Sequence, residues 1–498
     1  MNEVPTTGES FMHPTQILAD FVAGTDYLDI PEPARQQAKA GILDWVFVSL
    51  AGRKQEDRFI GNLEGLILGK GGNSESTIMG SKVRATENQA ALINGCIGHA
   101  LDYDETCPKV RSHLFAAIFP AILAAAESRG VSGREMLTAF IIGHEAAMRV
   151  GEAITPRWIK AGWHGTSLFG IFGAATGCAR LLKLDSQKVR MALGLASSMA
   201  GGLAVNFGSN AKCLHAGMAA ERGLFAAQLA QGGISANPNG LEGALGFYHA
   251  YNWGESAQLE CFQSLGRPWG LETPGISAIK LYPCCHGLAT NIECGIRIHK
   301  KFRLALEDIE VIEIHSQPKT LCAMLSRVYA DTGASIRWGY EGPPRQMKTI
   351  LPKTGAQAKF SKEYAFSRAL LDGEVRMKHL TDEAVNEPEV RKWMEKIRVF
   401  HNSEIEKVSN QYPEEQGPHA ERMIIRLKDG GTIREEETFI LGMANRPLSF
   451  QEVESKYRDC GAVAGLKARK IEQIISLIGH LEDHENVSLL MNQLNNED

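Results

Sequence analysis

Residues 162–182 read GWHGTSLFGIFGAATGCARLL, a helical pattern in which glycine and alanine recur at three- to four-residue spacing. Small residues at this spacing allow two helix backbones to approach closely. Alanine, glycine and methionine are as dense in residues 189–203 and 211–230. This part of the chain is therefore predicted to form a compact helical bundle with little room for strands.

Other stretches on both sides of this bundle also carry apolar residues at helical spacing. They are residues 33–50, 87–102 and 113–126, a segment that starts after Ser132, and residues 450–457 and 467–481 near the end. Proline at the start of the first stretch is a helix-entry signal. A polar tail is expected to follow the last helix.

The pattern changes near Ser277. Residues 309–315 (IEVIEIH) alternate apolar and acidic side chains, and residues 396–400 (KIRVF) are short and β-branched. Residues 422–427 and 432–439 flank an Asp-Gly-Gly turn and predict a β-hairpin. Helical patterns in residues 285–302 and 362–371 lie between these strands. The region is therefore predicted to be an α+β domain.

Composition excludes several classes of protein. The chain has 498 residues, too many for a single small binding module, and no run of 18 apolar residues that would span a membrane. Its net charge of -5 lacks the basic excess typical of nucleic-acid binding. Ten cysteines without Cys-x-x-Cys spacing indicate neither a disulfide scaffold nor a zinc ribbon. The first residues resemble no targeting peptide, so a cytoplasmic protein is expected.

The familiar motifs for cofactors and nucleophiles are missing from the sequence. It contains no dinucleotide fingerprint after a strand, no P-loop, no Gly-x-Ser-x-Gly elbow and no His-Glu-x-x-His. No cofactor is therefore expected.

Polar residues embedded in helix-packing sequence are the candidates for chemistry, because burying them without partners is costly. One group consists of His99, Asp102, Asp104, Glu105, Thr106 and His113. His99 and Asp102 are three residues apart and are expected to share a helical face. Asp102 and Thr106 would alternatively be a cap or turn pair. A divalent metal on His99 and Asp102 is a weaker alternative, because no third ligand is spaced to join them.

Three further groups are His164 between two glycines, Lys212 with His215 at the start of an apolar helix, and Lys280 where the composition changes. The structural alternative for His164 is a buried histidine with satisfied hydrogen bonds. The alternative for Lys280 is a lysine at the surface. An anionic ligand would explain Lys212. Cations and histidines together suit proton transfer next to a carboxylate.

These segments resemble the MmgE/PrpD family, which contains 2-methylcitrate dehydratases, cis-aconitate decarboxylases and iminodisuccinate epimerase-like enzymes. The matching stretches are NGCIGHALDYDET (94–106), HLFAAIFPAILAAAE (113–127), AGWHGTSLFGIFGAATG (161–177), NAKCLHAGMAA (210–220), IKLYPCCHGLAT (279–290), TGAQAKFSKEYAF (354–366) and NRPLSFQEVESKY (445–457). The resemblance covers nearly the whole chain.

The resemblance implies a mainly α fold without a cofactor and usually a homodimer. A large all-helical domain would comprise residues 1–275 and 442–498, with an inserted α+β lid domain at residues 276–441. Asp102 and Thr106 fall on the family's acidic-loop positions, His113 on the histidine after that loop, and His164 on the Gly-Trp-His position. Lys212 and His215 fall on the Lys-x-x-His position and Lys280 on the Lys-Leu-Tyr motif of the lid. Tyr340 and Tyr364 are both candidates for the lid tyrosine, and Tyr340 is the one included in the expected site.

The leading hypothesis is a cofactor-independent lyase that removes water or carbon dioxide from a small di- or tricarboxylate. Lys212, Lys280, His215 and Tyr340 would bind the substrate. His113 and His164 would exchange protons, oriented by Asp102 and Thr106. An epimerase of a small dicarboxylate is the runner-up, and a non-catalytic carboxylate-binding protein is a third alternative.

The chain departs from the family pattern next to these residues. His113 is followed by leucine where many members have proline, and the preceding loop contains Lys109 and Arg111. These two cations would either join the pocket or face water. The sequence does not decide which acid is the substrate.

Overall fold

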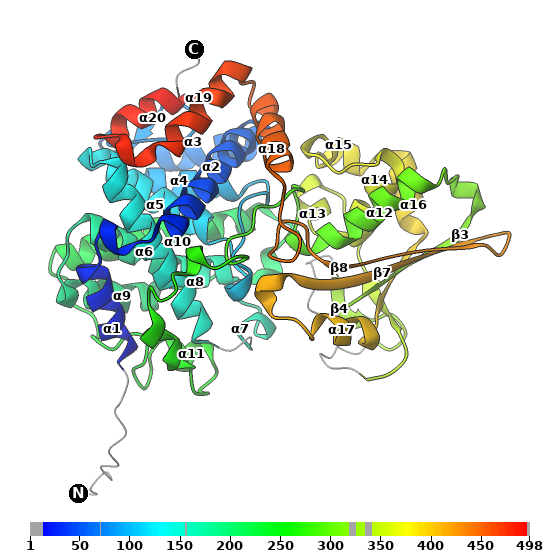
Figure 1. The fold of residues 1–498 in the computed structure, drawn as a ribbon, viewed down its shortest axis with the longest axis horizontal. Helices are drawn as coiled ribbons and strands as arrows, with labels where there is room; N and C mark the ends of the chain where they lie inside the picture. Colours follow the sequence, from blue (N-terminus) through cyan, green and yellow to red (C-terminus); the bar gives the residue numbers. More distant parts are fainter. Residues whose placement is uncertain (1–12, 70, 155–156, 318–324, 334–340, 496–498) are drawn as a thin grey trace, which may run out of the picture.

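Figure 1 shows two parts side by side, one helical and formed by both ends of the described chain, the other containing the main β-sheet. The computed structural model describes residues 13–69, 71–154, 157–317, 325–333 and 341–495. We call residues 13–275 and 442–495 the helical part, and residues 276–441 the lid. Helices dominate the described residues, so the predicted mainly α fold is confirmed.

The helical part begins with helices that match the predicted stretches, together with four that were not predicted, at residues 14–24, 57–68, 157–160 and 247–251. They are α1 (Pro14–Gly24), α2 (Glu32–Gln55), α3 (Asp57–Leu68), α4 (Glu87–His99), α5 (Leu114–Arg129), α6 (Gly133–Glu152), α7 (Arg157–Lys160), α8 (Gly165–Leu181), α9 (Ser186–Met199), α10 (Asn210–Gln231) and α11 (Phe247–Tyr251). Two-residue strands β1 (Ser76–Thr77) and β2 (Arg84–Ala85) pair with each other. The Ser132 side chain caps α6, which explains where that helix starts.

Helix α8 contacts α5, α6 and α10, and glycines make these contacts close. A Cβ atom on Gly173 would lie 2.7 Å from the carbonyl oxygen of Gly143 in α6. One on Gly223 of α10 would lie 2.7 Å from the carbonyl oxygen of Ile171. A larger residue would force these backbones apart, so the close packing predicted from residues 162–182 is confirmed.

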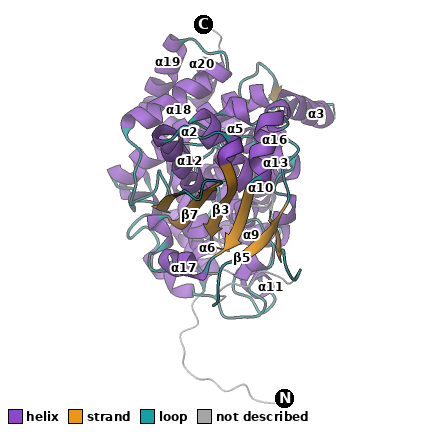
Figure 2. Cartoon of the chain, turned by 90° about the vertical axis from the view of Figure 1, so that its right-hand side faces the viewer, coloured by secondary structure: helices purple, strands orange, loops and turns teal. Residues whose placement is uncertain are grey.

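The lid contains a six-stranded sheet in the order β4-β5-β6-β3-β7-β8. The strands are β3 (Ile309–Ser316), β4 (Leu325–Tyr329), β5 (Arg345–Thr349), β6 (Ile397–His401), β7 (Pro418–Leu427) and β8 (Thr432–Phe439). Strands β3 and β6 are parallel, and the other neighbours are antiparallel. Figure 2 shows β3 and β7 side by side on this face of the molecule. The predicted hairpin is formed by β7 and β8.

Helices of the lid complete its core. They are α12 (Ala289–Lys301), α13 (Gly355–Ala358), α14 (Lys362–Asp372), α15 (Asp382–Val385), α16 (Pro388–Glu395) and α17 (Ser403–Ser409). Phe366 of α14 is buried with Ile312, Ile314 and Met423 of the sheet. The apolar face of the alternating strand β3 therefore packs against helices, as its pattern predicts.

The chain then returns to the helical part through α18 (Phe450–Val463), α19 (Ala468–Gly479) and α20 (Val487–Asn495). Helix α18 contacts α2, where the rings of Tyr457 and Phe47 stack with centroids 4.8 Å apart. The expected polar tail is wrong in part, because Leu490, Met491 and Leu494 of α20 are buried. Within the described ranges, no helix combines the length and hydropathy needed to cross a bilayer.

Candidate active site

A cavity of about 280 Å³ lies between the helical part and the lid. This volume is just below the range of about 300 to 1,000 Å³ that is typical of small-molecule pockets. The helical part contributes Asp102, Thr106, Arg111, His113, Trp158, His164, Phe207 and Lys212 to its lining. The lid contributes Cys285, His286, Gly287, Phe360, His419 and Ile440. The structure thus brings most of the predicted site residues to one cavity.

The loop after α4 positions the acidic residues. The helix ends at His99, and Asp102 has a left-handed backbone with φ of 52°. His99 and Asp102 therefore do not share a helical face, and that prediction is wrong. Thr106 pairs with Ala278 through two backbone hydrogen bonds of 3.0 and 2.9 Å, which fasten the loop to the start of the lid.

Asp102 lies between two buried lysines. The Lys212 ammonium donates to Asp102 Oδ1 at 2.8 Å and to His99 Nε2 at 2.6 Å. Lys280 Nζ lies 3.4 Å from Asp102 Oδ2 and donates to the backbone carbonyl of Asp102. Lys212 therefore has an internal counterion. The prediction that only an anionic ligand would explain its burial is wrong. Lys280 is 1% exposed, so the surface-lysine alternative is wrong. It lies behind Asp102 and is not among the residues that line the cavity.

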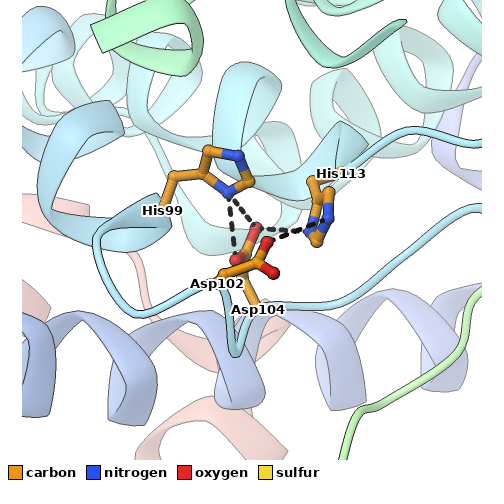
Figure 3. Close-up of side chains that lie close together, drawn as sticks. All are labelled: His99, Asp102, Asp104 and His113. Carbon is orange, nitrogen blue, oxygen red and sulfur yellow. Dashed lines mark hydrogen bonds and ion pairs between the residues drawn. The ribbon is translucent and has the colours of Figure 1, made fainter. Parts of the chain in front are cut away.

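The Asp104 carboxylate contacts the rings of His99 and His113, as Figure 3 shows. Its carboxylate oxygens lie 3.0 and 2.9 Å from His99 Nδ1, and Oδ2 lies 3.0 Å from His113 Nδ1. His113 Nε2 lies 3.4 Å from Asp102 Oδ1. Because Lys212 donates to His99 Nε2, His99 carries its proton on Nδ1 and donates to Asp104.

His164 precedes α8, and its Nδ1 lies 3.0 Å from Nδ1 of His215 in α10. One ring must donate and the other accept, so this contact fixes complementary tautomers. His164 lines the main cavity, whereas His215 is among the residues around a smaller neighbouring pocket. His215 therefore orients His164 from behind.

Thr106 reaches the lid side of the cavity. Its hydroxyl lies 2.9 Å from His286 Nδ1, and His286 Nε2 lies 3.3 Å from the carbonyl oxygen of Leu441. His286 belongs to the motif of residues 279–290, but its sequence context predicted no role for it. His419 of β7 was missed, because nothing in its surrounding sequence marks it. Arg111 lines the cavity, whereas Lys109 pairs with Glu152 at 2.8 Å.

Of the two tyrosine candidates, Tyr340 lies outside the described residues. Tyr364 is fully buried in the lid, where its hydroxyl donates to the carbonyl oxygen of His379. Tyr364 does not line the cavity, so the structure removes it as a candidate.

Burial lowers the pKa of the histidines that line the cavity and of His99 behind them. For His99 the pKa falls to about 4, where burial and the Lys212 charge outweigh Asp104. Burial also lowers the pKa of His113 and, together with Lys212, that of His164. Burial would raise the pKa of Asp102, but Lys212 and Lys280 bring it well below its usual range. At neutral pH the site therefore combines ionised carboxylates, ammonium groups and neutral imidazoles.

The same cluster has the composition of a metal site. Ligand atoms of His99, Asp102, Asp104 and His113 all lie within 4.8 Å of one another. The sequence predicted no third ligand to join His99 and Asp102 at a metal. The structure contradicts this, because it places Asp104 and His113 beside them. However, the Lys212 ammonium contacts both His99 and Asp102. Because a bound divalent ion would have to displace this ammonium, the donor set as it stands does not fit a metal well.

Known proteins resemble the chain over almost its full length. It matches the MmgE/PrpD N-terminal domain over residues 16–260 and the MmgE/PrpD C-terminal domain over residues 282–479. It is 27% identical to the cis-aconitate decarboxylase of Homo sapiens, over 96% of this chain and 93% of the relative. It is 25% identical to the cis-aconitate decarboxylase-like protein oryM of Aspergillus oryzae, over 97% of each. A cis-aconitate decarboxylase of Mus musculus is 26% identical over 84% of this chain and 80% of the relative.

Proposed function

Since the chain belongs to the MmgE/PrpD family, we propose that it is a cofactor-independent lyase that decarboxylates a small unsaturated tricarboxylate of the cis-aconitate type. The observation that carries this proposal is the placement of Lys212, His113 and His164 around one small cavity between the helical part and the lid. The names of the relatives favour decarboxylation over loss of water.

Decarboxylation requires a group that stabilises the developing negative charge and a group that donates a proton. In cis-aconitate, one carboxylate is attached to a CH₂ carbon beside the double bond. When that C–C bond breaks, carbon dioxide leaves and the electron pair forms a new double bond to the central carbon. The pair of the original double bond moves to the far carbon, which takes up a proton. Charge that develops there spreads into the carboxylate on that carbon.

Lys212 is suited to stabilise this developing charge, because it is a fixed ammonium in a buried site. His113 and His164 are the candidates for the proton donor. Burial lowers the pKa of both rings in the empty site, so they start neutral. A bound polycarboxylate adds negative charge beside them, which raises their pKa and favours protonation. Substrate binding would thus prepare the acid that completes the reaction.

A screen of acids tests the reaction type. Purified protein is incubated with cis-aconitate, 2-methylcitrate and iminodisuccinate, and each mixture is analysed by mass spectrometry and, for a change of configuration, by circular dichroism. We expect loss of carbon dioxide from cis-aconitate alone. Loss of water from 2-methylcitrate would instead assign a dehydratase. Racemisation of iminodisuccinate without a change of mass would assign an epimerase. Binding of all three without any product would favour the non-catalytic alternative.

A further inference from the structure

Two sets of polar groups face the cavity. Lys212 contacts Asp102 and His99, and its charge lowers the pKa of the buried His164. The second set consists of Arg111, His286 and His419, and the proposed reaction has no use for Arg111 or His419. These two residues come from different parts of the molecule, Arg111 from the helical part and His419 from strand β7 of the lid.

His419 is held in an unusual environment. The residue is 9% exposed, and its Nε2 is buried without a hydrogen-bond partner among the described residues. Leaving a buried polar atom unpaired costs on the order of 1 to 3 kcal/mol. The ring fits only because residue 287 is glycine, since a Cβ there would lie 2.8 Å from His419 Cε1. The imidazole is therefore held at the cavity wall beside the backbone of Gly287, where the ring can approach a bound ligand.

Arg111 lies at the end of the loop that contacts the lid. Its backbone is left-handed with φ of 45°, a conformation that non-glycine residues adopt at a cost. Lys109 in the same loop pairs with Glu152 at 2.8 Å and lies 3.6 Å from Glu415, four residues before His419. The loop that carries Arg111 is therefore fastened to the segment that carries His419. After burial, the charges of Lys362 and Arg111 contribute to the lowered pKa of His419.

We propose that Arg111 and His419 form a carboxylate-binding subsite that spans the helical part and the lid, and that this subsite selects tricarboxylates over dicarboxylates. The inference rests on the proposed function only in taking the ligand to be a polycarboxylate. A guanidinium can bind a carboxylate through two parallel N–H donors. A neutral imidazole N–H adds a third donor from the other side of the cavity. Lys212 remains for a second carboxylate of the same molecule, and Thr106 with His286 for a third, so a dicarboxylate can bind without the subsite.

Binding calorimetry with two unreactive probes tests the subsite. Propane-1,2,3-tricarboxylate carries the third carboxylate, and pentanedioate lacks it. We expect Arg111→Gln and His419→Gln each to weaken binding of the tricarboxylate by about ten- to hundredfold, the range for a charge-assisted hydrogen bond. Binding of pentanedioate should change by less than about threefold. Lys300→Gln removes one charge at an exposed position of α12 and is the matched control, because Lys300 does not line the cavity.

The decisive quantity is the ratio of the two dissociation constants, that of pentanedioate divided by that of propane-1,2,3-tricarboxylate. If Arg111→Gln weakened both probes equally, or neither, while its melting temperature matched that of the unsubstituted protein, the subsite would be refuted. Failure of the unsubstituted protein to bind propane-1,2,3-tricarboxylate at millimolar concentration would also overturn it. This result is independent of the proposed function, because the two dissociation constants can be measured even if the protein releases no carbon dioxide from any acid. A large loss of turnover with an unchanged ratio would count against the subsite alone.

Discussion

Replacing Asp102 by asparagine is expected to destabilise the folded protein by about 3 to 5 kcal/mol, the cost of removing one partner from a buried ion pair. Asparagine is nearly isosteric and tolerates the left-handed backbone at this position, so the substitution removes mainly the charge. The Asp102 carboxylate lies 2.8 Å from Lys212 Nζ and 3.4 Å from Lys280 Nζ.

Coulomb's law with an effective dielectric constant of 20 gives the scale of what is lost. Two unit charges attract by about 6 kcal/mol at the Lys212 distance of 2.8 Å and by about 5 kcal/mol at the Lys280 distance of 3.4 Å. Both lysines stay buried in the variant and retain other partners, Lys212 at His99 and Lys280 at a backbone carbonyl. The net loss is therefore smaller than the sum of the two attractions.

Urea unfolding of purified protein measures the effect. Asp57→Asn, at an exposed position at the start of α3, is the matched control and should change stability by less than about 0.5 kcal/mol. Adding Lys212→Met to Asp102→Asn should recover at least about 1 kcal/mol, because one unpaired buried charge disappears. A loss below about 1 kcal/mol for Asp102→Asn, with no recovery in the double variant, would refute Asp102 as the counterion of the lysines.

Three further outcomes are expected. His113→Ala and His164→Ala should each lower kcat by on the order of 10²-fold or more while propane-1,2,3-tricarboxylate still binds; normal turnover in either variant would exclude that ring as a proton carrier. Burial lowers the pKa of His144 to about 3, against about 6.5 in the unfolded chain, so its contribution to stability is complete above pH 6.5 and is lost as the pH falls. Between pH 7.5 and 5, His144→Leu should therefore lose about 2 kcal/mol less stability than the unsubstituted protein, and equal losses in urea titrations would contradict this. Dialysis against EDTA should leave turnover unchanged, because Lys212 already contacts two of the potential ligands; activity that falls and returns with a divalent ion would establish a metal at His99 and Asp102.

The sequence was most informative where small residues dominate a helix. Glycine and alanine in residues 162–182 predicted both the helix and its close contacts, because small residues have few other reasons to recur at that spacing. The MmgE/PrpD resemblance is confirmed by matches to both of its domains. Strands β4 and β5 were not predicted, since a segment such as RQMKT in β5 has no alternating pattern. The homodimer and the cytoplasmic location stay predictions.

Contacts between distant residues explain what was missed in the site. Asp104 joins His99 to His113 because the chain turns sharply at Asp102, and a helical spacing argument does not anticipate that turn. Lys212 finds its counterion 110 residues earlier in the chain. His419 enters from an ordinary strand, so only the fold of the lid reveals that it lines the cavity.

The most direct test of the proposed decarboxylation is incubation with cis-aconitate in deuterated water, with carbon dioxide and deuterium measured together. The account predicts one carbon dioxide released per product molecule, and one deuterium in that product at the carbon that gains the proton. It also predicts that His113→Ala and His164→Ala slow both events together. Deuterium in recovered substrate without release of carbon dioxide, or no reaction with cis-aconitate at any protein concentration, would contradict the account.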